Sequence, residues 1–180
     1  MKNLKKILVA TDLTDMSRPG LRYACSLAAD ERAALTVLHV ANEFAAWEYY
    51  SDEFAWGYCP AKIWPRDRIL AEANLDLNHF LEQHIEAIKQ IPLVTKQIVF
   101  GPVAQRIAEV AEDEQADLVV MTPRRQQRLR AFFSTSVTAT VMRLSPCPVL
   151  AVTSPLPSRL LRGRSQPSRL GWLRPSGANI

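Results

Sequence analysis

Apolar and polar residues follow one another in blocks along the chain up to residue 153. Four short runs are almost continuously apolar, at residues 7–11, 35–40, 118–121 and 148–152, and a fifth run at 94–100 alternates apolar with polar residues. Continuous β-branched runs are typical of strands buried on both faces of a parallel sheet, whereas alternation indicates a strand at a sheet edge. The pattern therefore predicts five parallel strands, with the third at an edge.

The segments between these runs carry apolar residues at helical spacing. One such stripe runs from Leu21 to Ala28, a long helix is predicted over 65–90, and Ser134 or Thr135 is predicted to cap a short helix before the last strand. Strands and helices that alternate in this way predict an α/β fold with right-handed crossovers. We expect an open five-stranded parallel sheet of strand order 3-2-1-4-5, with helices on both faces.

Several stretches are similar to one known family. The segments ILVATD, GPVAQRIAEVAEDEQADLVVM and PCPVLAV resemble universal stress proteins, and the resemblance extends from Lys5 to Val152. It implies a Rossmann-like domain of the adenine nucleotide alpha hydrolase type over residues 1–153. It also implies a stress-response protein that acts through protein contacts.

Many members of that family carry the pattern G-x2-G-x9-G-[ST] after the fourth strand, where it wraps the phosphates of ATP. At that spacing this chain has Thr122, Arg125 and Thr135 in place of the glycines, followed by Ser136. Glycine serves a phosphate loop because it reaches φ > 0 and lets backbone N–H groups approach the anion. β-Branched and bulky residues adopt such conformations only at a cost. The chain thus resembles the branch that lacks these glycines and is thought not to bind ATP.

The resemblance also defines where a nucleotide would bind if the site were retained. In the family an acidic residue at the position of Asp12 contacts the ribose, and a valine at the position of Val40 contacts the adenine. The residues themselves leave a second interpretation open, in which Asp12 is a turn or capping residue in TDLTDMS. The full candidate set is Ala10, Thr11, Asp12, Val40, Met121, Thr122, Arg124, Arg125, Thr135, Ser136 and Val137.

The basic loop between the fourth strand and the last helix allows an alternative. Arg124, Arg125, Arg128 and Arg130 lie within seven residues, and guanidinium groups bind phosphate well without glycines. The alternatives are an ATP-binding protein that uses this loop, with ATP as the only candidate cofactor, and a simple solvated loop. No common hydrolase, metalloprotease or P-loop motif is present, so we predict neither an enzyme nor a metal site.

The last predicted strand is the candidate dimer contact. In the family, homodimers commonly form when this strand pairs with its mate as an exposed sheet edge. The corresponding residues here are Pro148, Val149, Leu150, Ala151 and Val152.

Two segments depart from a simple α/β domain. Residues 42–64 hold eight of the fourteen aromatic residues and four acidic residues. We expect this insertion either to pack over its own domain, closing the nucleotide cleft, or to bind a protein partner. Residues 154–180 hold five arginines and no acidic residue, and we expect a basic, disordered tail.

The tail accounts for the basic character of the chain. Without its five arginines, 17 of the 22 basic residues remain against 18 acidic ones, so the net charge of +4 does not indicate a basic nucleic-acid-binding domain. RNA or DNA association through the basic loop and tail remains the third hypothesis. Three cysteines without metal-type spacing suggest a reduced, cytoplasmic setting, and no apolar run predicts a membrane span.

Overall fold

The structure is a computed structural model that describes residues 4–41, 65–123 and 136–153. The predictions for residues 42–64 and 154–180, and those for Arg124, Arg125 and Thr135, lie outside the described residues.

All five strands pair in parallel in one sheet of order β3-β2-β1-β4-β5, which confirms the predicted topology. The strands are β1 (Lys6–Thr11), β2 (Ala34–Ala41), β3 (Val94–Phe100), β4 (Leu118–Met121) and β5 (Val149–Ala151). The central strand β1 has almost entirely buried side chains, whereas β3 at the edge keeps Thr95 and Lys96 exposed. The alternating pattern of β3 thus corresponds to an edge strand, as predicted, whereas β5, the other edge strand, has a continuous apolar pattern.

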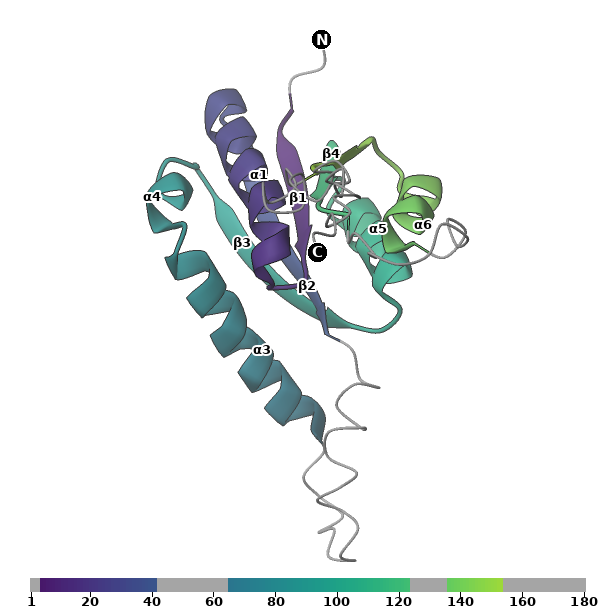
Figure 1. The fold of residues 1–180 in the computed structure, drawn as a ribbon. Coiled ribbons are helices and arrows are strands. Elements are labelled where there is room, and N and C mark those ends of the chain that lie inside the picture. The colour runs from purple at the N-terminus through teal and green to yellow at the C-terminus, as the bar shows by residue number, and fades with distance from the viewer. Residues whose placement is uncertain (1–3, 42–64, 124–135, 154–180) are drawn as a thin grey trace, which may run out of the picture.

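Helices cover both faces of the sheet (Figure 1), as predicted. One face carries α1 (Arg18–Glu31), which follows the 3₁₀ turn η1 (Asp15–Ser17), together with α3 (Pro65–Glu82) and α4 (Ile85–Ile88). The other face carries α5 (Val103–Asp113) and α6 (Val137–Leu144). This distribution is what right-handed crossovers on either side of β1 produce.

Each face has its own apolar core. Leu21, Leu77 and Phe80 are among the buried residues that pack between the sheet and α1, α3 and α4. Ile107 and Val141 belong to the cluster between the sheet and α5 and α6. Successive strand residues point to opposite faces, so each buried strand contributes to both cores.

Two helix ends differ from the sequence prediction. Ser136 is the N-cap of α6, and its Oγ accepts the N–H of Ala139 at 3.1 Å, so the prediction of Ser134 or Thr135 as the cap was wrong. The long helix predicted to reach residue 90 ends at Glu82, and α4 follows as a separate turn. At this break a ring nitrogen of His84 lies 3.1 Å from the carbonyl oxygen of Phe80, so the side chain satisfies a carbonyl at the helix end.

Candidate functional site

The carboxyl ends of β1, β2 and β4 meet at one edge of the sheet, where open α/β sheets bind ligands. Ala10 and Met121 are direct neighbours in the β1–β4 register. Val40 and Met121 are buried and Ala10 half-buried, and all three pack with the core on the α5/α6 side. The structure therefore brings three of the four apolar residues of the predicted nucleotide site to the same face, while the fourth, Val137, is the first residue of α6. We call the group of three the apolar edge.

Asp12 follows β1 in a tight, hydrogen-bonded turn. Its Oδ1 accepts the N–H of Thr14 at 3.1 Å and the Thr14 hydroxyl at 2.6 Å, which is the geometry of an aspartate that stabilises a turn. Leu13 has φ 60°, a conformation that is costly for a bulky residue. The turn interpretation of Asp12 thus has direct support, while its carboxylate is also exposed at the predicted edge.

Thr11 holds the other side of this turn. The Ser17 hydroxyl donates to the Thr14 carbonyl at 2.8 Å and lies 2.8 Å from the Thr11 hydroxyl. A hydroxyl has only one proton, so Thr11 Oγ1 is the donor in the second bond. Thr11 Oγ1 in turn accepts the N–H of Leu13 at 3.0 Å. The predicted site residue Thr11 is therefore buried and committed to the turn.

Thr122, at the first glycine position of the phosphate pattern, contacts the N-terminus of α1. Its Oγ1 accepts the N–H of Gly20 at 3.1 Å and lies 3.5 Å from the Ser17 carbonyl oxygen. A Cβ added to Gly20 would lie 2.5 Å from this Oγ1, closer than real Cβ contacts allow. Thr122 and Gly20 are therefore a matched pair that joins the end of β4 to α1.

The first four backbone positions of a helix have no hydrogen-bond acceptor within the helix for their N–H groups. In α1 each of these four positions either has another acceptor or has no N–H. The N–H of Ser17 donates to the Thr14 carbonyl, and that of Arg18 donates to the Asp15 carbonyl. Pro19 has no N–H, and Gly20 donates to Thr122. This helix start consequently offers no open backbone donor to an anion.

The remaining predicted residues lie at the start of α6 and along β5. Ser136 uses its hydroxyl as the cap described above, and Val137 is 42% exposed. Val149, Leu150 and Ala151 are half-buried. Among the described residues β5 pairs only with β4, so its outer edge is open.

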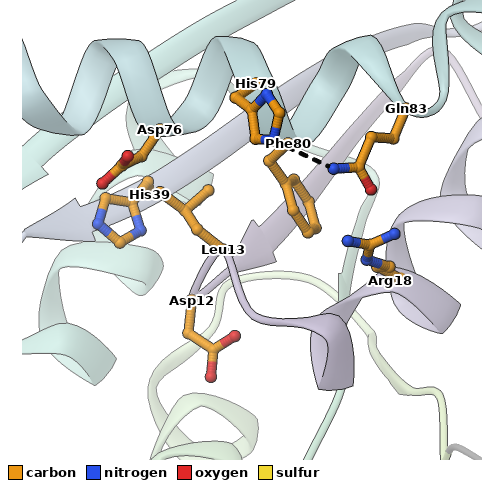
Figure 2. Close-up of a pocket in the computed structure, with 8 residues that line it drawn as sticks. All are labelled: Asp12, Leu13, Arg18, His39, Asp76, His79, Phe80 and Gln83. Atoms are coloured by element: carbon orange, nitrogen blue, oxygen red, sulfur yellow. Dashed lines mark hydrogen bonds between the residues drawn. The ribbon is translucent and has the colours of Figure 1, made fainter.

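A separate pocket lies on the α1/α3 side of the same edge (Figure 2). It has a volume of about 450 Å³ and is lined from three directions: by Asp12 and Leu13 after β1, by Arg18 at the start of α1, and by His39 of β2 with four residues at the end of α3 and just after it. Asp76, His79 and Phe80 belong to α3, and Gln83 follows its last residue. This pocket was not predicted from the sequence, although the alternation of His39 and Val40 on opposite faces of β2 was a signal for it.

The described part of the chain offers little support for a metal site or a reactive thiol. There, no three His, Cys, Asp or Glu residues are grouped so that they could hold a metal ion. Burial raises the pKa of the Cys25 thiol to about 11, so this core cysteine is a neutral, unreactive group near neutral pH. None of the described helices has the length and apolar character required to cross a bilayer.

Comparison with known proteins identifies a common family. A model of the universal stress protein family matches residues 3–153. The universal stress protein YxiE of Bacillus subtilis is 28% identical over 158 residues, which cover 82% of this chain and 97% of the relative.

Solved structures share the fold at lower identity. The structure of hypothetical protein MJ0577 is 23% identical with a TM-score of 0.64, covering 86% of this chain and 99% of its own. A universal stress protein crystallised in complex with cAMP is 23% identical with a TM-score of 0.54, covering 86% and 100%.

Proposed function

The chain belongs to the universal stress protein family, and we propose that it is a non-enzymatic, dimeric stress-response protein in which the glycine-type ATP site has been lost. The observation that carries this proposal is the position of Thr122. Where the family pattern places a glycine beside the phosphates, this side chain caps α1 and fills the space next to Gly20. A phosphate at this point would have to displace both the hydroxyl and its hydrogen bond.

Two further residues support the loss of the nucleotide site. Ser136 uses its hydroxyl to cap α6, and Asp12 uses Oδ1 to hold the turn after β1. The apolar edge formed by Ala10, Val40 and Met121 persists. That surface would suit an adenine ring, so the alternative function is nucleotide binding with altered phosphate contacts.

Equilibrium ATP binding to the full chain tests the proposal. We expect no saturable binding at about 150 mM salt, because salt at this concentration screens the non-specific attraction between arginines and phosphates. Micromolar binding that survives this salt concentration and weakens in Asp12→Asn would refute the loss of the site and favour the nucleotide-binding alternative. Asp113→Asn, an exposed change on α5, is the matched control.

The contrast between the two sheet edges supports the dimer part of the proposal. At β3, the exposed Lys96 donates to Asn78 of α3 at 2.5 Å, and the Arg66 guanidinium lies 4.8 Å from the centre of the Phe100 ring. Charge and helix contacts of this kind protect an edge strand. β5 has no charged residue, and Met142 and Leu144 of the adjacent α6 are each 50% exposed. This edge and helix are suited to pairing with a second copy.

The hydrogen-bond directions in β5 give a sharp test of pairing. The Pro148 carbonyl and the Val152 N–H bond to β4, so the alternate residues, Val149 and Ala151, direct their backbone groups outward. Ala151→Pro therefore removes an outward N–H without removing a β4–β5 bond. We expect a dimer for the full chain and for the control Ala151→Ser, and a folded monomer for Ala151→Pro, by size-exclusion chromatography with light scattering. A monomeric parent chain at micromolar concentration would contradict this interface.

The thiols suggest where the protein works. Cys25 and Cys147 are both free, which fits a reducing, cytoplasmic compartment.

A further inference from the structure

The pocket between α1 and α3 has charged groups at two ends, and the Asp12 carboxylate lines it from the turn after β1. In Figure 2, Asp76 and His39 lie at one end, Arg18 and Gln83 lie at the other, and the Phe80 ring lies between them. Phe80 is only 4% exposed and forms an apolar floor. An apolar floor with a few polar groups at defined positions is typical of a small-molecule site.

The acidic end is oriented by the strands. His39 Nδ1 lies 3.0 Å from the Thr11 carbonyl oxygen, which can only accept, so Nδ1 carries a proton and Nε2 is the ring nitrogen that can accept from a ligand. Asp76 adds an exposed carboxylate from α3. A carboxylate and an imidazole acceptor together match the donors of a primary ammonium group.

The basic end is oriented by the turn before α1. Arg18 Nη2 pairs with Asp15 at 2.6 Å, and its side chain is 34% exposed. The Arg18 Nε is buried and has no acceptor among the described residues. An unsatisfied guanidinium donor in a pocket wall calls for an acceptor such as a carboxylate. The Gln83 amide supplies a further donor at the same end.

We propose that this pocket binds a small zwitterion, with its ammonium group toward Asp76 and His39 and its carboxylate toward Arg18 and Gln83. A cation alone would leave the Arg18 Nε without an acceptor, and an anion alone would face Asp76 and Asp12 without compensation. The 450 Å³ volume accommodates a molecule of the size of an amino acid. The pocket lies on the opposite face of the sheet from the apolar edge and shares only Asp12 with the predicted nucleotide site, so the proposal goes beyond the proposed function.

The probe is 6-aminohexanoate, and hexylamine and hexanoate serve as its two halves. We would titrate each into the isotope-labelled full chain and follow the backbone amide signals of Leu13, His39 and Phe80 by NMR. We expect saturable shifts at these residues, with the zwitterion binding about tenfold more tightly than either half, since both ends must contribute. Equal affinity for a half-probe, or shifts centred on Val40 and Met121, would overturn the proposal.

Paired variants separate the two ends. Asp76→Asn should weaken the zwitterion about tenfold and leave hexanoate binding unchanged or tighter, and Arg18→Gln should weaken the zwitterion similarly and spare hexylamine. The matched controls are Asp113→Asn on α5 and Arg143→Gln on α6, which are exposed on the other face. If the controls reduced affinity as much as the pocket variants, the binding would be non-specific and the proposal wrong.

Discussion

The two faces of the sheet differ most where they meet the carboxyl edge. On the α5/α6 side, Ala10, Val40 and Met121 form an apolar surface at the place where the family binds nucleotide. On the α1/α3 side lie the strand neighbours Thr11 and His39, which are hydrogen-bonded to each other, and His39 lines a polar pocket. Because successive strand residues point in opposite directions, one step in sequence separates an apolar site from a charged one. The family motif therefore describes only part of this edge, and the pocket on the α1/α3 side has to be analysed separately.

Helix α3 contributes to both the core and the pocket of the α1/α3 face. A substitution that creates a cavity beneath α3 should therefore cause the largest loss of stability. Leu77 is fully buried, and Leu77→Ala is expected to lower the free energy of unfolding by about 2–5 kcal/mol. Denaturant unfolding measures this change. The control is Leu75→Ala on the same helix, where the side chain is 68% exposed and the expected change is within about 0.5 kcal/mol. Similar losses for both variants would mean that α3 is not packed as described.

Each face also carries one described cysteine, and the two should differ in reactivity. With a pKa of about 11, roughly one Cys25 thiol in a thousand is ionised at about pH 8. Cys147 is half-buried near Ser145. In a Cys59→Ser background, we expect iodoacetamide to label Cys147 at least about 100-fold faster than Cys25. Unfolding the protein should remove the difference. Equal labelling of the native protein would contradict the buried position of Cys25.

The same shift has a consequence for stability. The unfolded thiol loses its proton near its ordinary pKa of 9.0, while the folded thiol keeps it up to about 11. Between these values the folded state binds more protons than the unfolded state, so the free energy of unfolding decreases as pH rises.

The contact of Thr122 with Gly20 joins the end of β4 to α1. Thr122→Val keeps the shape and removes the hydroxyl, so the Gly20 N–H loses its acceptor, and we expect a loss of about 1–2 kcal/mol. Thr122→Ser should retain most of the stability. Gly20→Ala should also destabilise, and combining it with Thr122→Gly should cost less than the two changes added together, since the Cβ then has space. Strict additivity would show that the two residues are not a matched pair.

The sheet was predictable from the sequence because its strands carry the apolar pattern directly. The continuous runs at β1, β2 and β4 and the alternating run at β3 fixed the order once the crossover hand was assumed. Helix ends were less predictable: Ser134, Thr135 and Ser136 are all suitable caps, and only tertiary structure selects Ser136.

Only the part of the candidate site on the α5/α6 face could be predicted from the sequence. The family resemblance named Ala10, Val40 and Met121, and the structure brings them together. The resemblance showed that Thr122 replaces a glycine, but not that it caps α1, because Gly20 is 102 residues away in sequence. The sequence also did not predict Asp76 and Gln83 as pocket residues, because in the sequence they look like ordinary exposed residues of a helix.

The smallest predicted effect concerns the start of α6, on the face of the apolar edge. Ser136 Oγ accepts the Ala139 N–H, so Ser136→Ala should lower the free energy of unfolding by about 1 kcal/mol, and Ser136→Asp should retain stability because aspartate also caps helices. Denaturant unfolding of the three proteins gives the comparison. The result also bears on the proposed function: if Ser136→Ala were neutral, its hydroxyl would not be committed to the helix. It would then be available to a ligand at the apolar edge, as the nucleotide-binding alternative requires.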